Sequence, residues 1–157
     1  MSIQSKLSVE IDRPIEQVFE LANNDLVDWS LTCVEEELLD EGEVGIGTKF
    51  RLVTEEKRGK RTSRMEFQGT TTAWDPPLLS ACLLQGQYFV IDVSYTFEDL
   101  GQGRTKVTQE SLVEGKGILK VMFFLFGWAM KKQGCEAQQK ELDSLRRYCE
   151  SKEPVGA

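Results

Sequence analysis

Histidine does not occur anywhere in the 157 residues of this chain, and its absence removes several kinds of active site. Nucleophilic catalysis by a Ser-His-Asp or Cys-His arrangement needs an imidazole as the base, so neither arrangement can be present. Acid–base chemistry would have to come from carboxylates, tyrosine or lysine. The composition therefore favours a binding protein over an enzyme and leaves other kinds of enzyme open.

Cysteines at the spacing of metal ligands are also lacking. The four cysteines, Cys33, Cys82, Cys135 and Cys149, are widely scattered, and no two of them form a Cys-x-x-Cys pair. Zinc sites usually combine closely spaced cysteine and histidine ligands. We therefore expect no metal and no cofactor, and we expect reduced thiols that are mostly buried.

The chain has neither a long apolar run nor an excess of basic residues. Its most apolar stretch, residues 118–130, contains Lys120 and is shorter than the about 20 residues that cross a membrane. The first residues lack the apolar core of a signal peptide. The formal net charge of −7 disfavours binding to phosphate backbones. We expect a cytoplasmic protein with no nucleic-acid partner.

Length and patterning indicate one globular domain. Hydrophobic residues make up 40% of the chain, which is enough for a core that stands without disulfides. No repeat and no long linker divides the sequence. We predict a single domain over residues 1–152, followed by a flexible tail over residues 153–157.

Most of the chain shows the period-two alternation of half-buried β-strands. It is clearest where Phe89, Ile91, Val93, Tyr95 and Phe97 share one face. The last six strands are joined by short turns and must be mostly antiparallel. We predict that Tyr95 points inward, towards the final helix. The predicted strands span residues 3–11, 32–40, 49–56, 61–74, 79–85, 88–98 and 104–113.

Helices are predicted in two places. Two short ones follow the first strand, the first beginning near Pro14 and ending at Asn23, the second covering residues 26–29. The other helix is the long segment from Ile118 to Glu150, which no proline interrupts. At about 1.5 Å per residue it would reach roughly 50 Å, so it should lie across a whole sheet. Gly127 and Gly134 are places where it could bend.

The order of these elements resembles the helix-grip superfamily, which includes the START domains, the birch-pollen allergen type and the polyketide cyclase/dehydrase and lipid-transport group. The segments that carry the resemblance are residues 11–14 with Val18-Phe19, Trp29, residues 45–50, 74–77, 95–98 and 104–108, then Leu142, residues 145–147 and Glu150. The resemblance implies an α+β fold in which a seven-stranded, curved antiparallel sheet wraps round a long C-terminal helix. Two short helices lie between strands 1 and 2, and an apolar cavity separates sheet and helix. It implies no reaction, because the superfamily includes binders, transporters and enzymes.

Within that fold, we predict a ligand-binding site between the sheet and the final helix. Methionine and aromatic side chains at helical spacing would form one wall, and rings with a few polar tips would face them from the strands. The alternative interpretation is a plainly filled core, in which each polar tip finds a backbone partner. The predicted site residues are Phe50, Phe67, Phe89, Tyr95, Gln109, Met122, Phe123, Phe126 and Met130.

Three functional interpretations follow. The first is binding of a small hydrophobic or amphipathic molecule, lipid-like or polyketide-like. The second is an enzyme of the polyketide cyclase/dehydrase type that uses the same cavity. The third concerns Phe124 and Trp128, which lie on another side of the long helix and could contact a second copy of the chain or a membrane surface.

Overall fold

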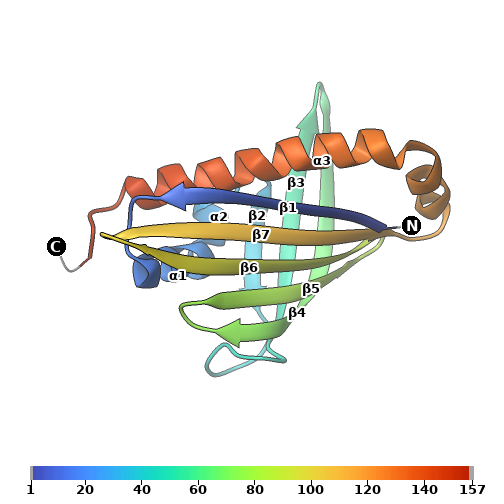
Figure 1. Cartoon of the computed structure of the whole chain (residues 1–157). Helices are drawn as coiled ribbons and strands as arrows, with labels where there is room; N and C mark the ends of the chain where they lie inside the picture. The colour runs from blue at the N-terminus through green and yellow to red at the C-terminus, as the bar shows by residue number, and fades with distance from the viewer. Residues whose placement is uncertain (1, 156–157) are drawn as a thin grey trace.

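The computed structural model describes residues 2–155, without the side chain of Arg58. Figure 1 shows one sheet with a long helix lying along it and two short helices at one end. Met1 and residues 156–157, which belong to the predicted domain and tail, lie outside the described residues. The elements in chain order are β1 (Ser2–Ile11), α1 (Ile15–Asn24), α2 (Leu26–Trp29), β2 (Cys33–Leu38), β3 (Lys49–Arg58), β4 (Arg61–Asp75), β5 (Leu79–Gly86), β6 (Phe89–Gly101), β7 (Arg104–Gly115) and α3 (Ile118–Glu150).

The sheet confirms the predicted architecture. Its seven strands run in the order β1-β7-β6-β5-β4-β3-β2, and every neighbouring pair is antiparallel. The first strand therefore pairs with the last. In Figure 1, β3 runs across the direction of β1 and β7, which shows how strongly the sheet curves. This curvature gives the sheet a hollow inner face that α1, α2 and α3 cover.

The register of β6 and β7 is the predicted one. Tyr95 lies opposite Gln109 in an antiparallel ladder. Tyr95 is largely buried and packs against the main core, whereas its neighbour Thr96 is exposed. A slip of one residue would have exchanged these two environments.

The second half of α3 belongs to the main hydrophobic core. Leu142, Leu145 and Cys149 are fully buried there against α1 and the inner face of β1, β6 and β7. The ring of Phe19 lies 5.2 Å from that of Trp74 and 5.0 Å from that of Phe97, measured between centroids. Complete burial of each such leucine is worth about 2 kcal/mol. This half of the helix is thus fixed to the sheet.

The first half of α3 follows a different course. Phe126 has φ −125° and ψ 15°, which is not helical, so the helix kinks one residue before Gly127. Figure 1 shows the segment before the kink turning away from the helix axis at the end of the molecule opposite α1. We call residues 118–128 the aromatic arm. Because the kink reorients this segment, the faces of the two halves cannot be read from one continuous helical wheel.

The C-terminal end of α3 is held by the start of α1. The guanidinium of Arg13 donates hydrogen bonds to the backbone oxygens of Glu150 and Lys152, at 2.6 and 2.8 Å. Gln17 donates to the Glu153 oxygen and accepts from the Val155 nitrogen. The predicted tail from residue 153 therefore begins with residues that contact α1. Arginine is well suited to this place, because it neutralises the negative end of the helix dipole.

No helix within residues 2–155 combines the length and the apolar character needed to cross a bilayer.

Candidate functional site

A cavity of about 320 Å³ lies between the inner face of the sheet and the helices. That volume is at the lower end of the range for small-molecule sites. Strands β2 to β7 supply most of its walls, α1 and α2 close one side, and α3 contributes Glu141. Elements that are far apart in the sequence line the cavity together, because the curved sheet brings them to one inner face.

The wall formed by β3, β5 and β6 is apolar. Its residues alternate along each strand with outward-facing ones, so a period of two places their side chains in the cavity. The ring of Phe50 lies directly over Gly69, where even a methyl group would come 2.2 Å from its Cζ atom. Gly69 thus makes room for the Phe50 ring rather than forming a bulge. The apolar members of this wall are Phe50, Leu52, Leu84, Ile91 and Val93.

A group of polar atoms interrupts the apolar lining. The Gln109 amide nitrogen donates to the Tyr95 hydroxyl at 2.8 Å. The amide oxygen of Gln109 and the hydroxyl oxygen of Thr54 are buried, and neither has a hydrogen-bond partner within residues 2–155. A buried acceptor without a partner costs about 1–3 kcal/mol. A ligand that donates a hydrogen bond to Gln109 would recover that cost.

Burial shifts the ionisable groups of the cavity towards their neutral forms by raising their pKa values. Burial raises the pKa of Glu141, whose carboxylate accepts hydrogen bonds from the Ser30 hydroxyl at 2.8 Å and the Leu31 nitrogen at 2.7 Å. Burial likewise raises the pKa of Tyr95, and it raises the pKa of the Cys33 and Cys82 thiols to about 12. Thiols with so high a pKa are poor nucleophiles.

The described lining has carboxylates but no basic side chain. Glu141 and Glu36 both line the cavity, and neither lysine nor arginine does. Glu36 lies opposite Leu52 in the β2–β3 ladder and is exposed near the edge of the sheet. An anionic group entering the cavity would therefore meet no counter-charge there.

The predicted site residues fall into two groups in the structure. Phe50, Tyr95 and Gln109 line the cavity. Phe67 is buried in a neighbouring cluster with Cys33 and Leu52. Phe89 stacks on Phe123, with 6.0 Å between ring centroids. Each of these two rings lies outside the cavity lining.

The helix residues predicted as a pocket wall do not form one. Phe123 is only 1% exposed and packs on Phe89, while Met122 and Phe126 face solvent and Met130 is half-buried. The kink at Phe126 is part of the physical reason, because it reorients the segment with Met122 and Phe123 relative to the part of α3 that covers the cavity. Any role of these four residues in binding stays a prediction.

Several residues of the cavity lining were not predicted from the sequence. Leu52, Leu84, Ile91 and Val93 share the inward register of strands whose alternation was recognised, so that pattern could have identified them. Trp29 was seen only as part of the resemblance; its indole nitrogen donates to the Ala22 oxygen at 3.0 Å. Glu141 had no signal beyond its place beside Leu142 on a mostly charged segment.

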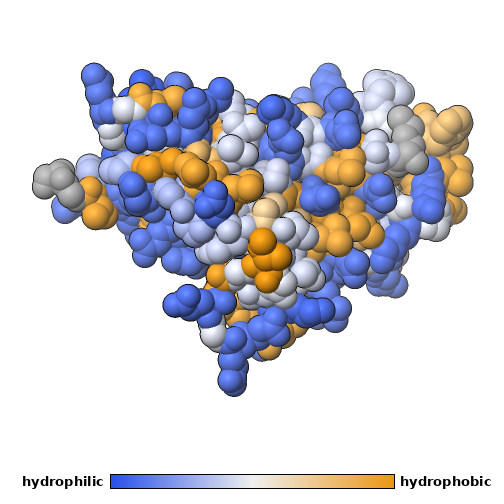
Figure 2. Space-filling view, turned by 60° about the horizontal axis from the view of Figure 1, so that its bottom comes forward, coloured by the Kyte–Doolittle hydropathy of each residue, from blue (hydrophilic) through white to orange (hydrophobic). Residues whose placement is uncertain are grey.

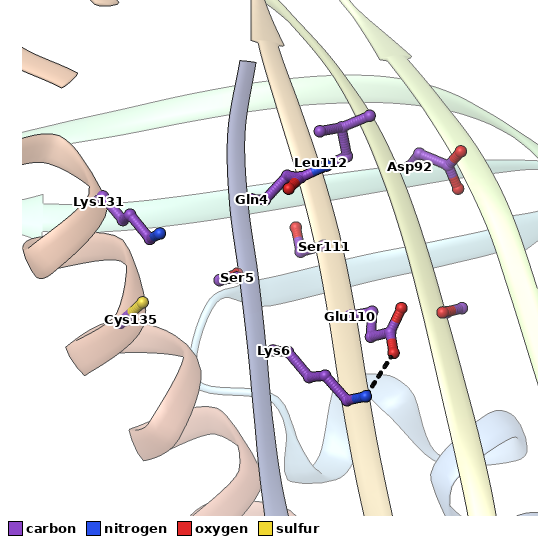
Figure 3. Close-up of a pocket in the computed structure, with 10 residues that line it drawn as sticks. Gln4, Ser5, Lys6, Asp92, Glu110, Ser111, Leu112, Lys131 and Cys135 are labelled. Carbon is purple, nitrogen blue, oxygen red and sulfur yellow. Dashed lines mark ion pairs between the residues drawn. The ribbon is translucent and has the colours of Figure 1, made fainter. Parts of the chain in front are cut away.

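Other hollows lie at the surface and are polar. Figure 3 shows one of about 660 Å³ along β1, β6 and β7, where Lys6 and Glu110 form an ion pair at 3.2 Å. Lys131 and Cys135 lie on the α3 side of β1, and Asp92 and Glu110 lie on the other side. The charged groups do not converge on a common point, and an exposed ion pair contributes little. The apolar cavity is therefore the better candidate site.

Comparison with known proteins places this geometry in a wide structural group. No family model and no curated protein sequence matches the chain. Among solved structures, a START superfamily protein from Mycobacterium smegmatis is similar with a TM-score of 0.74 and 17% identity, over 95% of this chain and 98% of that one. The Zhui aromatase/cyclase from Streptomyces sp. R1128 gives 0.70 and 13%, over 96% and 94%. Ara h 8.0201 gives 0.62 and 14%, over 97% and 100%. With a sheet that wraps round a C-terminal helix and two short helices after the first strand, this chain has the helix-grip fold.

Proposed function

We propose that this protein binds a small amphipathic molecule in the cavity between the sheet and α3. The observation that carries the proposal is the buried Gln109 amide oxygen, which lines a mostly apolar cavity and has no partner within the described residues. Ligand sites typically combine mostly apolar walls with a few placed polar groups. A core evolved only for packing would have satisfied this atom.

The polar groups define the chemistry of the ligand. Gln109 offers a free acceptor, and Glu141 and Glu36 are acidic, so the ligand should present a hydroxyl or an amine. A carboxylate would place a negative charge beside acids with no lysine or arginine in the lining. A phenolic, polyketide-like molecule therefore suits the cavity better than a free fatty acid.

Binding without catalysis is the better-supported activity. Acid–base catalysis usually relies on two groups whose environments move their pKa values apart. Here burial moves the pKa of Glu141, Tyr95, Cys33 and Cys82 in the same direction, towards the neutral form. The similarity to an aromatase/cyclase supports a shared scaffold for ring-shaped ligands, and a scaffold alone carries no reaction.

Two probes of matched shape test the proposal. We expect 2-naphthol to bind more tightly than 2-naphthoate, because only the naphthol can donate to Gln109 without bringing a charge. Gln109→Leu should weaken naphthol binding by about fivefold, since a typical hydrogen bond contributes about 1 kcal/mol. Fluorescence titration measures both affinities. Gln139→Leu, on α3 and outside the lining, is the control.

Failure of the proposal would be equally visible. If neither probe binds the wild-type protein, or if naphthoate binds as well as naphthol in wild type and variant alike, the cavity does not select donors. Native mass spectrometry of protein purified from its own cell would then show whether another mass accompanies the chain.

A further inference from the structure

The aromatic arm exposes an unusual concentration of apolar side chains. Seven of the seventeen exposed large hydrophobic residues lie within its eleven positions. Phe124 is 75% exposed and Trp128 is 78% exposed. Figure 2 shows hydrophobic side chains gathered at the end of the molecule where α3 begins. Isolated exposed apolar residues need no explanation, but a cluster of this size indicates a contact surface.

Part of the cluster occupies one face of an anchored helix. Val121, Phe124 and Leu125 are spaced at i, i+3 and i+4 before the kink, so they lie on one side. Trp128 follows directly after the kink and is exposed as well. The opposite side packs on the sheet through Phe123, whose ring lies on Phe89. The exposed face is therefore held in place and directed outward rather than left on a loose segment.

The charges around this face have one sign. From residue 115 to residue 135 the sequence contains four lysines and no acidic residue, in a chain whose net charge is −7. The four are Lys116, Lys120, Lys131 and Lys132. All are exposed, and within residues 2–155 none of them forms an ion pair. Along the sequence, positive charges alone thus flank the aromatic side chains of an otherwise acidic protein.

We propose that the aromatic arm docks on an anionic lipid bilayer. Helices that lie in a bilayer interface combine aromatic and leucine side chains on one face with lysines beside them. Tryptophan prefers the interface itself, and each lysine near an anionic surface adds attraction. Tyr88 adds a half-exposed ring at the same end, where its backbone oxygen accepts from the Lys116 nitrogen.

A second copy of the chain is a poorer occupant of this surface. In a two-fold dimer the same patch lies on both sides of the interface, so Lys120, Lys131 and Lys132 of one copy would lie near lysines of the other. No acidic residue within the patch could offset that repulsion. A bilayer with anionic head groups supplies the missing opposite charge and accepts the apolar face at the same time.

Vesicle co-sedimentation of the full chain tests the proposal. Wild-type protein should bind vesicles of phosphatidylcholine with 30% phosphatidylglycerol at least about tenfold more strongly than vesicles of phosphatidylcholine alone. The double substitution Phe124→Ser with Trp128→Ser should lower binding by about tenfold or more. Lys120→Gln with Lys132→Gln should lower it by about fivefold for each lysine. Ile46→Ser is the control, because Ile46 is 74% exposed but lies between β2 and β3.

Three results would overturn the proposal. One is equal binding of wild-type protein to both kinds of vesicle. Another is binding by the Phe124→Ser, Trp128→Ser protein at wild-type strength, with circular dichroism confirming that it is folded. The third is a concentration-dependent mass in light scattering that this double variant abolishes, without vesicle binding by either protein. That outcome would assign the surface to a second copy.

Discussion

Gly69 shapes the cavity because it has no side chain. The Phe50 ring occupies the space that a β-carbon would need, and Phe50 is part of the cavity wall. The ring can therefore keep its position only while residue 69 is glycine. A small change at a position outside the lining is thus expected to alter the lining.

We predict that Gly69→Ala destabilises the protein by about 1–3 kcal/mol, the usual cost of overpacking. The Phe50 ring must move, so naphthol affinity should change as well. Urea unfolding and dye titration measure the two effects. Gly45→Ala is the matched control, since no atom lies within 4 Å of its added carbon. Equal stability of the two variants would show that the ring has room to give way.

Glu141 ties the stability of the fold to pH. Burial raises its pKa above the ordinary value of 4.5, so over the interval above pH 4.5 the folded state keeps a proton that the unfolded chain has lost. The contribution of this group to stability is fully present below that interval. It is lost as the pH rises through the raised pKa.

Replacing Glu141 with glutamine should remove this dependence. We expect Glu141→Gln to gain stability relative to wild type as the pH increases from 4.5 to 7, because the variant never places a charge in the cavity wall. Thermal unfolding at several pH values gives the difference. Glu136→Gln, on an exposed part of the same helix, should run parallel to wild type. A constant difference between Glu141→Gln and wild type would contradict the assignment.

At the scale of elements, α3 consists of two parts with different attachments. Its second part is embedded in the main core through Leu142, Leu145 and Cys149. Its first part is fixed mainly through Phe123 on Phe89. The two parts should therefore respond differently when one anchoring side chain is removed.

We predict that Phe123→Ala releases the aromatic arm while the rest of the domain stays folded. Its cost in unfolding free energy should be smaller than the about 3–5 kcal/mol expected for Phe97→Ala in the main core. Hydrogen exchange should accelerate within residues 118–128. Naphthol affinity should not change, because Phe123 lies outside the lining. Loss of naphthol binding in Phe123→Ala would instead connect the arm to the cavity.

These elements also show how much of the structure can be predicted from the sequence. Alternation places β6 with Tyr95 inward, and burial agrees where it is clearest, since Val93 and Phe97 are buried while Asp92, Thr96 and Glu98 are exposed. The start of α3 follows directly after Gly115 and Gly117. Gly127 marks a place where α3 could bend, and the kink lies one residue before it. The sequence has no pattern for the direction of the bend, which depends on how the arm packs on Phe89. The same tertiary packing decides which rings line the cavity. The structure therefore brings only some of the predicted site residues together there.

At the scale of the whole molecule, the cavity and the aromatic arm are separate surfaces. The cavity lining contains no residue of the arm. The cavity contains acids without basic partners, and the arm carries lysines without acidic ones. An amine or phenol is therefore suited to the first surface and an anionic lipid to the second, so one molecule could hold a ligand while it contacts a bilayer.

The pairing of β1 with β7 bears on how the chain is made. The residues that pair are separated by roughly a hundred positions, and ribosomes add about 5–20 residues per second. For on the order of ten seconds after its own synthesis, β1 has no partner strand, while hairpins such as β6–β7 close locally. Arg13 waits longer still, because its acceptors on Glu150 and Lys152 lie 137 and 139 positions later in the chain. The nascent chain thus carries an unpaired β1 edge until β7 has been synthesised.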